Sequence, residues 1–482
     1  MSTLLIFIVI FSFFALLLGV SYFSSRNAEN ETFFTGNRRS PWYLVAFGMI
    51  GSTISGVTFI SVPGEVGNSA WTYLQFLLGN FIGYWVIALV LIPLYYRLKL
   101  VSIYTYLDRR FGIRSYKTGA FFFLLSQTIG ASFRLYLAAG VLQIAFFDAL
   151  GIPFGVTVML TLALIWAYTF KAGIKTVVWT DFLQTLLMIG AVVATTVVIS
   201  GQLNIGFGEM IATVSSHPYS QVFDWDWQSK TNFFKQFAAG LGIAIVLNGL
   251  DQNMMQKNLT CKTKRDAQKN IFWFSFAFII ANLFFLSLGV MLYSFAQQKG
   301  IALPQRSDDL FPLLAVRHFG VFAGILFLLG ILSAAYSSAD SALTALTTSF
   351  CIDLLGLKAD APTGRATRFK VHIGFTALLF LVIVLFRIIN NESVVMAVFR
   401  VAGYTYGPLL GLFAFGILTG KQVKDRFVPF ICLLSPVLSY VISVNSKAWF
   451  GGYEFGFELL LLNGLITFTG LLLLAYFSRV VT

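Results

Sequence analysis

Charged side chains are scarce in this sequence. They make up 11% of its 482 residues, whereas about 25% is usual in a soluble domain. Apolar residues make up 57%, and many runs are long enough for a helix of about 20 residues to cross the hydrocarbon core of a bilayer. The composition therefore excludes an ordinary soluble domain and predicts a membrane protein.

Cysteine and histidine are also rare, with three of each. The cysteines, Cys261, Cys351 and Cys432, show neither a paired pattern nor the spacing of metal ligands. The histidines lie far apart and near expected helix ends, where structural or solvated histidines are common. Neither a disulfide framework nor a histidine metal centre is predicted.

The apolar runs predict helices, because an outer-membrane barrel would need alternating strands of about ten residues. The opening run, Leu4 to Phe23, lacks the basic start and the cleavage site of a signal peptide, so we expect a retained span. Residues 1–482 are expected to form a single all-α polytopic transmembrane domain. About 13 spans are expected, at 3–22, 42–66, 70–96, 117–147, 153–171, 175–200, 232–255, 270–298, 321–354, 370–388, 393–420, 427–446 and 455–478.

Basic residues gather in alternate loops. One set of loops holds about 24 of the 33 lysines and arginines, with Lys257 among them, and the opposite set holds about five, so the positive-inside rule places the richer set in the cytoplasm. The N-terminus is then outside a cell or inner membrane, and the C-terminus is cytoplasmic. This bias explains the net charge of +13. No basic face with a stacking platform accompanies it, so nucleic acid is not an expected partner.

Ionisable residues inside the expected spans are few. A charge in hydrocarbon is costly, so each such residue is a functional hypothesis. Lys235 and Arg387 lie near span ends and can extend their charged heads to the interface, so we expect structural roles for them. The remaining set comprises Arg134, Asp181, Asp251, Asp340 and Arg400.

The stretch LSAAYSSADSALTALTTS, residues 332–349, carries many small oxygen-bearing side chains. At 100° per residue, Ala334, Ser337, Ser338 and Ser341 share one helix face, with Asp340 beside it. Hydroxyls, a carbonyl and a carboxylate together suit a small, hard cation such as sodium. Close packing of small residues between two helices is the alternative, although it does not explain Asp340.

Two further stretches extend this hypothesis. In AGIKTVVWTDFLQ, residues 172–184, Asp181 has no cationic partner nearby in sequence, so either a bound cation or a hydrogen bond to a neighbouring helix must stabilise it. In GMIGSTISGVTFISVPGEVG, residues 48–67, glycines and hydroxyls interrupt an apolar run and favour a broken helix. The span at 238–256 is also polar and Gly-rich, and paired interrupted spans are typical of inverted-repeat transporters.

These stretches, together with FFTGNRRSPWYLVAFGMIGSTISGVTFISVPGEV, TYLDRRFG and AAYSSADSALTALTTSFCIDL, resemble the corresponding segments of the sodium/solute symporter family. The resemblance implies a LeuT-type core of two inverted five-helix repeats, at 42–200 and 232–420. It also implies an extra helix at 3–22 and two extra helices at 427–478. Sodium ions and a small solute are the implied ligands.

The resemblance also implies two ion sites. The first is formed by the carbonyls of Gly51, Ile54 and Ala334 and by the hydroxyls of Ser337 and Ser338. Some family members hold a second sodium, and the matching positions here are Asp181, Ser337, Asp340 and Ser341. Whether one or two sodium ions bind is left open, as is the oligomeric state.

The solute of this family lies beside the broken helix. By position, the expected contacts are Ser52, Thr53, Ser55, Thr58, Tyr73, Gln75, Arg134 and Asp251. Arg134 needs a counter-charge, which a carboxylate solute would supply. In the family's sialic acid transporters the solute-binding arginine matches Gly130, one turn earlier.

We therefore expect a sodium-coupled symporter that imports a small organic solute by alternating access. An organic anion is favoured, such as sialic acid, a monocarboxylate or a vitamin acid. A sodium-coupled sugar or polyol symporter and a proton-coupled transporter of the same fold are the alternatives. An enzyme is not expected, because Asp181 and Asp340 lack a nucleophile–base arrangement, and a channel would need a symmetric pore-lining repeat.

Overall fold

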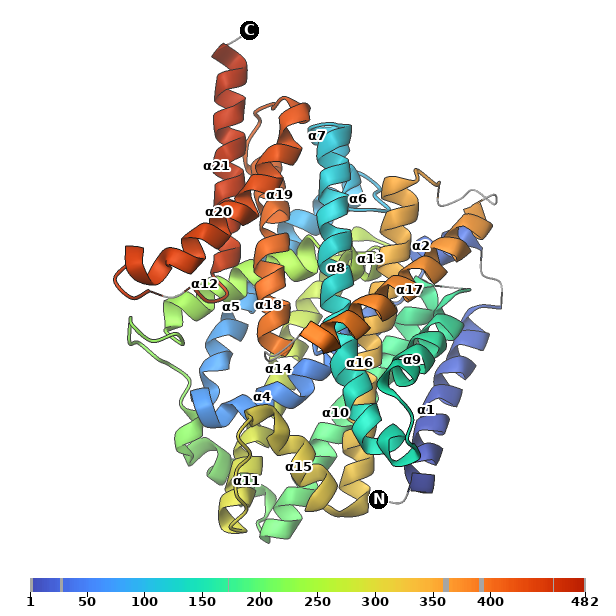
Figure 1. The fold of residues 1–482 in the computed structure, drawn as a ribbon, viewed down its shortest axis with the longest axis vertical. Coiled ribbons are helices and arrows are strands. Elements are labelled where there is room, and N and C mark those ends of the chain that lie inside the picture. Colours follow the sequence, from blue (N-terminus) through green and yellow to red (C-terminus); the bar gives the residue numbers. More distant parts are fainter. Residues whose placement is uncertain are drawn as a thin grey trace.

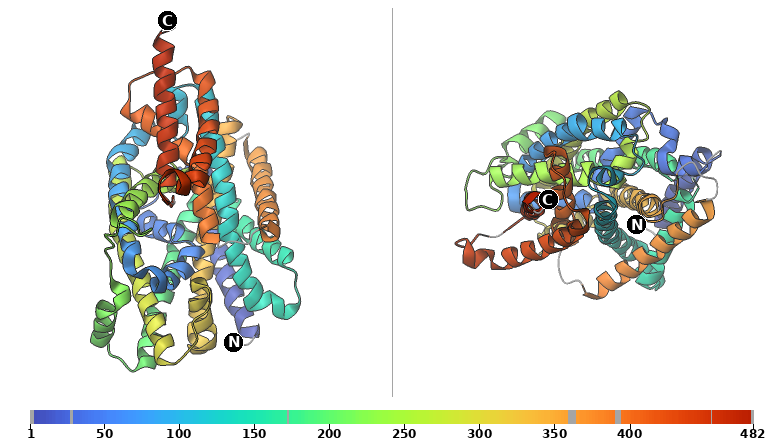
Figure 2. Two further views of the ribbon diagram at one scale, coloured as in Figure 1. Left: turned by 60° about the vertical axis from the view of Figure 1, so that its left-hand side comes forward. Right: turned by 90° about the horizontal axis from the view of Figure 1, so that it is seen from above.

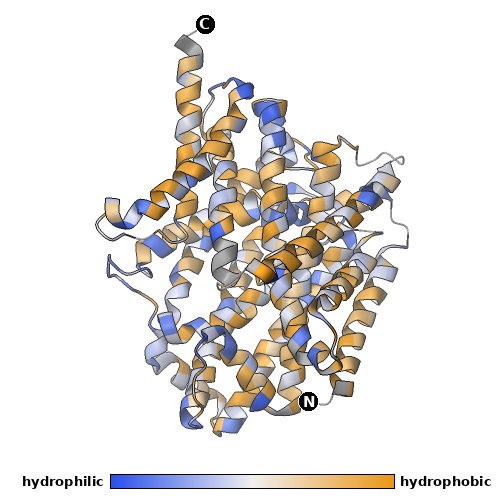
Figure 3. Cartoon of the chain, viewed as in Figure 1, coloured by the Kyte–Doolittle hydropathy of each residue, from blue (hydrophilic) through white to orange (hydrophobic). Residues whose placement is uncertain are grey.

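Helices make up almost all of the regular structure. The computed structural model describes residues 3–26, 29–171, 173–358, 364–389, 394–453 and 455–480. Within these residues no extended strand forms, and the only β-type pairing is an isolated bridge between Ser40 and Cys261. Hydrophobic residues cover most of the long helices (Figure 3). The prediction of an all-α membrane protein is confirmed.

The long helices are continuous apolar segments that satisfy their own backbone groups, as hydrocarbon requires. They are α1 (Thr3–Ser24), α8 (Ile113–Leu142), α10 (Ile174–Leu203), α14 (Lys264–Gln298), α16 (Gly320–Ser349), α17 (Arg365–Ile389), α20 (Val428–Trp449) and α21 (Leu459–Val480). Medium-length helices complete the bundle: α3 (Trp42–Thr53), α4 (Gly56–Ser69), α5 (Tyr73–Val86), α6 (Ile92–Arg97), α9 (Phe154–Thr169), α12 (Phe233–Ala244), α13 (Gln252–Asn258), α18 (Val394–Thr405) and α19 (Gly407–Leu418). Short helices occupy the connections: α2 (Asn30–Thr35), α7 (Thr105–Arg110), α11 (Phe207–Ser216) and α15 (Leu310–Arg317).

Fewer helices qualify as membrane spans than the sequence predicts, when the helices of the structure are judged by length and composition alone. In the described part of the chain, nine helices are long and apolar enough to cross a membrane, and a bent pair makes a tenth. One of the nine, Gly56–Arg97, is 42 residues long and contains a break at Ala70, where φ is 50° and ψ is −146°. Three further apolar helices, α3, α9 and α19, are shorter than these spans. The number of thirteen spans therefore stays a prediction. The expected start of the span 393–420, residue 393, lies outside the described residues.

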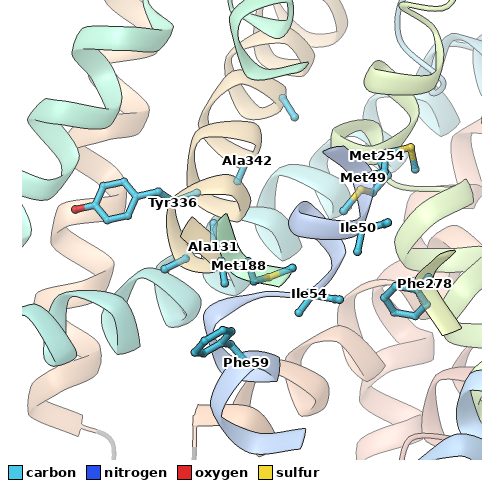
Figure 4. Packing of buried hydrophobic residues seen from close by; sticks show 14 of the residues in the cluster. Met49, Ile50, Ile54, Phe59, Ala131, Met188, Met254, Phe278, Tyr336 and Ala342 are labelled. Atoms are coloured by element: carbon cyan, nitrogen blue, oxygen red, sulfur yellow. The ribbon is translucent and has the colours of Figure 1, made fainter. Parts of the chain in front are cut away.

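The predicted break in the first interrupted span is present. Helix α3 ends at Thr53 and α4 begins at Gly56. Between them Ile54 (ψ 89°) and Ser55 (ψ 168°) leave the helical region. The Ser55 hydroxyl accepts a hydrogen bond from the Thr58 backbone N–H and so caps α4. Figure 4 shows the unwound ribbon passing Ile54, between the turns that carry Ile50 and Phe59.

The second interrupted span is broken in the same manner. Helix α12 extends through a π-type turn to Gly249, and α13 begins at Gln252 at an angle of 67°. Asp251 caps α13, because its carboxylate accepts hydrogen bonds from the backbone N–H groups of Asn253 and Met254. Both breaks thus restart with a side-chain cap, which satisfies backbone donors that would otherwise be orphaned inside the bundle.

Packing interlocks the two halves of the chain. The first broken helix contacts α10 and also α14 and α16, which come much later in the sequence, while α12 packs along α5. Figure 4 shows the buried contacts around the first break, with Met188 from α10, Phe278 from α14 and Ala342 from α16. The break therefore lies at the centre of the bundle, shielded from lipid by the surrounding helices.

The two ends of the chain lie at opposite ends of the molecule. Helix α1 starts at the end where α11 and α15 lie, and α21 finishes at the end where α7 lies (Figures 1 and 2). We call these the α11–α15 end and the α7 end. This arrangement agrees with an odd number of crossings.

Candidate cation cluster and solute cavity

The aspartate on α10 and the serine-rich turn of α16 meet directly. The Ser337 hydroxyl donates a hydrogen bond to Asp181 Oδ1 at 2.5 Å. Both side chains are completely buried. Ser52 Oγ from the broken helix lies 3.2 Å from Ser337 Oγ. Three helices that are far apart in sequence therefore contribute oxygens to one buried cluster.

Lys257 completes this cluster and corrects the sequence analysis. Its ammonium lies 2.7 Å from Asp181 Oδ2 and also donates a hydrogen bond to Ser52 Oγ. The assignment of Lys257 to a cytoplasmic loop was wrong, because it belongs to α13 and its side chain is only 1% exposed. The cationic partner of Asp181 is distant in sequence, as the break that directs α13 into the bundle brings it there.

Asp340 lies in the same region, where three hydroxyl groups contact its carboxyl group. Its Oδ2 accepts hydrogen bonds from the hydroxyls of Tyr168, at 3.0 Å, and Thr180, at 3.3 Å. Its Oδ1 lies 3.2 Å from the donating Ser341 hydroxyl. Since Thr180 precedes Asp181 in α10, the two carboxylates belong to one polar region. The structure thus brings together all four residues expected at the second ion site.

The residues expected at the first ion site also surround the break. A Cβ added at Gly56 would lie 3.3 Å from Ala335 Cβ, so the start of α4 packs tightly against this turn of α16. On that turn, Ser338 Oγ lies 3.3 Å from the Ala334 carbonyl and 3.0 Å from the Ala335 carbonyl. Gly51, Ile54, Ala334, Ser337 and Ser338 are all buried. Their donor atoms are carbonyl and hydroxyl oxygens, as sodium sites at unwound helices require.

Gly51 has a steric role besides its carbonyl. A Cβ at this position would lie 2.3 Å from Thr185 Oγ1 on α10. The Gly51 N–H donates a hydrogen bond to that hydroxyl at 3.0 Å, and Thr185 donates in turn to the Asp181 carbonyl at 2.7 Å. Glycine therefore permits the close approach that connects the broken helix to the aspartate-bearing helix. Among the described residues, no group of three His, Cys, Asp or Glu side chains forms a transition-metal site.

A cavity of about 140 Å³ adjoins the break. Most of the residues that the sequence predicts to contact a solute line this cavity: Ser52, Thr53, Ser55, Thr58, Tyr73, Arg134 and Asp251. Ser52 also belongs to the cation cluster. The cavity and the cluster therefore share a wall, which is the broken helix.

Arg134 folds back over the position of Gly130. Its Nε donates a hydrogen bond to the Gly130 carbonyl at 3.0 Å, and its Nη2 lies 3.3 Å from the point where a Cβ of residue 130 would be. The guanidinium therefore occupies space near residue 130 although its backbone is one turn further along α8. The positive charge of Arg134 therefore lies at the wall of the cavity, near residue 130.

Asp251 is engaged by protein donors on both oxygens. Oδ1 caps α13, and Oδ2 accepts a hydrogen bond from the Tyr406 hydroxyl. Tyr406 joins α18 to α19 and also lines the cavity. Asp251 therefore fixes the second break to the helices that close the cavity.

Amide side chains in the cavity wall were missed by the sequence analysis. Asn80 Oδ1, Gln127 Nε2 and Asn253 Oδ1 are buried and have no hydrogen-bond partner in the part of the chain that the structure describes, and all three residues line the cavity. Unpaired buried polar atoms are costly, so a solute that pairs with them would gain affinity. Isolated amides within apolar runs are the signal that could have identified them.

The sequence also predicts Gln75 at the solute site. It is not among the residues that line the cavity. Its amide donates to the Thr231 carbonyl at 2.9 Å and accepts from the Asp224 N–H at 3.2 Å, so it anchors the loop before α12. Burial tends to raise the pKa of Asp224 in that loop, but hydrogen bonds from Ser229 and Thr231 outweigh burial and lower it.

Arg400, another candidate, lies on α18 with an exposed side chain.

Three sequence relatives are sodium-coupled transporters. The sodium/sialic acid symporter SiaT of Proteus mirabilis is 26% identical over 445 residues, covering 89% of this chain and 88% of the relative. The sodium/sialic acid symporter NanT of Aliivibrio fischeri is 26% identical over 468 residues, covering 92% and 87%. The human sodium/iodide cotransporter is 25% identical over 412 residues, covering 83% and 62%.

Solved structures establish the fold. A substrate-bound, outward-open state of a sodium-coupled sialic acid symporter aligns with a TM-score of 0.82 and 22% identity, covering 98% of this chain and 97% of that one. Mhp1, a nucleobase-cation-symport-1 family transporter in a closed conformation, aligns with a TM-score of 0.58 and 13% identity, covering 94% of each. The LeuT-type fold inferred from the resemblance is therefore confirmed.

The family assignment rests on the sequence itself. The family model described as the sodium:solute symporter family matches residues 33–424, which is most of the chain. Its members couple solute movement to sodium, and the relatives above are transporters rather than enzymes. The chain belongs to the sodium:solute symporter family and is a multi-pass membrane protein.

Proposed function

We propose that this protein imports a small organic anion together with sodium by alternating access. The observation that carries the proposal is the position of Ser52. It lines the solute cavity and also lies 3.2 Å from Ser337 in the oxygen cluster. An ion held between the broken helix and α16 would therefore stiffen the wall that the solute contacts.

The first ion site supplies the coupling. Sodium bound by the carbonyls of Gly51, Ile54 and Ala334 and the hydroxyls of Ser337 and Ser338 would join α3 and α4 to α16. Coupling requires that sodium bind one conformation better than the other, and a site divided between two moving elements meets this condition. The membrane potential contributes about 2.3 kcal/mol per charge per 100 mV to inward movement.

The side from which ligands arrive follows from the orientation we propose, with the N-terminus outside and the C-terminus cytoplasmic. A second cavity of about 550 Å³ shares Thr58 and Tyr73 with the solute cavity and is also lined by Glu65, Arg306 and Asp308 near α15. This vestibule extends from the solute cavity toward the α11–α15 end, which is the outer end in this orientation.

We retain repeat boundaries of 42–200 and 232–420, with extra helices at 3–22 and 427–478.

The charge of Arg134 favours an anionic solute over a sugar or polyol. A carboxylate can accept two parallel hydrogen bonds from a guanidinium. The two sialic acid symporters among the relatives make N-acetylneuraminate the first acid to test, followed by monocarboxylates and vitamin acids. Proton coupling through Asp181 and Asp340 is the remaining alternative of the same fold.

A thermal-shift panel tests this proposal. The purified protein is melted with N-acetylneuraminate, lactate, pantothenate or galactose, in sodium chloride and in choline chloride at one pH. We expect an acid to raise the melting temperature in sodium only, because a ligand at 100 times its Kd stabilises the folded state by about 2.7 kcal/mol. Stabilisation by galactose alone would favour the sugar alternative, and an equal effect in choline would contradict sodium coupling.

A further inference from the structure

Lys257 occupies the position in the oxygen cluster that a cation would take. Among the described residues, its ammonium contacts two oxygens, Asp181 Oδ2 at 2.7 Å and Ser52 Oγ. Asp181 and Ser52 belong to different helices, α10 and α3, and the lysine enters from a third, α13. A buried ammonium is stable only where a counter-charge and acceptors replace its lost water, and this cluster supplies both.

Both carboxylate oxygens of Asp181 already have partners, so little of its capacity to coordinate a sodium ion remains. One carboxylate oxygen accepts the Ser337 proton at 2.5 Å, and the other pairs with Lys257. Ser52 Oγ, which accepts from the lysine, lies 3.2 Å from Ser337 Oγ. Two of the side chains expected to bind a second sodium, Asp181 and Ser337, therefore bind each other, and Asp181 also binds the lysine.

The charges of the cluster lead to the same result. Asp340 accepts a hydrogen bond from Tyr168 and lies within hydrogen-bond distance of the hydroxyls of Thr180 and Ser341. Asp181 and Lys257 form a buried ion pair, so the charge of Asp181 is already balanced. A sodium ion at Asp181 would add an uncompensated positive charge beside this buried pair, which is unfavourable.

We infer that Lys257 is a built-in cation that takes the place of a second sodium at Asp181, so that this chain binds one sodium ion. The inference rests on the proposed sodium coupling and specifies its stoichiometry. Lys257 is accordingly a residue that determines ion number, and Asp181 is its counter-ion rather than a sodium ligand.

Direct binding of ²²Na⁺ to the purified protein tests the inference, with choline maintaining ionic strength. We expect wild-type protein to saturate at one ion per chain and Lys257→Gln to saturate at two, because the neutral side chain frees Asp181. Lys262→Gln is the matched control, since Lys262 follows α13 and is exposed, and it should bind one ion. Two ions in the wild type, or one ion in Lys257→Gln, would overturn the inference.

A charge-neutral double variant covers the case in which Lys257→Gln does not fold. Lys257→Gln with Asp181→Asn removes both charges together and leaves a hydrogen-bonding pair in their place. We expect it to bind one sodium ion with an affinity within about threefold of the wild type. A loss of sodium binding in a folded double variant would make Asp181 a sodium ligand and overturn the inference. No sodium binding by the wild type would instead contradict the proposed function itself.

Discussion

At the scale of single residues, Ser52 is where the two sites meet. Its side chain belongs to the cavity wall and also contacts Ser337 and Lys257. Serine suits this position because its hydroxyl donates one hydrogen bond and accepts others. A change on either side of Ser52 therefore alters the hydrogen bonds on the other side.

Arg134 carries the prediction about solute charge. Arg134→Gln should weaken binding of an anionic solute at least tenfold in sodium, which corresponds to about 1.4 kcal/mol, because a charge-assisted hydrogen bond is lost. Arg134→Lys keeps the charge but not the planar pair of donors, so its loss should be smaller. Isothermal titration with the acid found by thermal shift measures both variants. Equal affinity in wild type and Arg134→Gln would show that the guanidinium does not contact the solute.

The residues at the two sites differ in how far the sequence could predict them. The hydroxyls near residues 52 and 337 were predictable because polar residues interrupt apolar runs. Lys257 was not, because it follows the apolar run that ends near 255 and so resembles a loop residue. Its burial depends on the direction of α13 after the break, and this direction is set by tertiary packing. Gln75 does not line the cavity, and its position in the sequence does not reveal which loop its side chain anchors.

At the scale of elements, the central feature is a pair of broken helices that cross the bundle. The sequence predicts both breaks, since glycine and hydroxyl residues disfavour a continuous helix there. It does not predict which residues cap the restarted helices. Ser55 and Asp251 serve as caps because each has extended backbone geometry and a side-chain oxygen that reaches the N–H groups of the next turn.

The crossing of α5 and α12 depends on reciprocal glycines. A Cβ at Gly240 would lie 2.0 Å from the Phe76 carbonyl oxygen, and a Cβ at Gly79 would lie 2.0 Å from the Phe237 carbonyl oxygen. Backbone atoms at such distances cannot rotate away as a flexible side chain can. The two helices, one from each half of the chain, are therefore in near backbone contact, as at other small-residue interfaces in membranes.

Gly240→Ala should separate these helices and destabilise the protein by about 1–3 kcal/mol, the usual cost of overpacking. Gly190→Ala is the control, because a Cβ at Gly190 on α10 meets nothing within 4 Å. Thermal unfolding of both variants in the same detergent measures the difference. A Gly240→Ala variant as stable as Gly190→Ala would mean that the crossing can relax without cost.

At the scale of the whole molecule, the fold could be predicted from composition, the apolar runs and the family resemblance. The helical class and the broken helices are confirmed. The total number of spans is not confirmed, because helix length and composition join α4, α5 and α6 into one segment of 42 residues and leave out the shorter α3, α9 and α19.

The positions of the two sites indicate to which end of the molecule the solute cavity opens. The cation cluster and the solute cavity share Ser52 of the first broken helix, and the vestibule extends from the cavity toward the α11–α15 end. Sodium bound at the break should therefore favour a solute cavity that is open to that end. We therefore expect solute uptake to depend on the sodium gradient and on the serines of α16.

Uptake of the labelled acid into proteoliposomes tests this central claim most directly, with sodium replaced by choline at fixed pH. The account predicts concentrative uptake with an inward sodium gradient, none with choline, and none with sodium in the Ser337→Ala/Ser338→Ala double variant reconstituted at the same level. Equal uptake in choline, or unchanged sodium-driven uptake by the double variant, would contradict it.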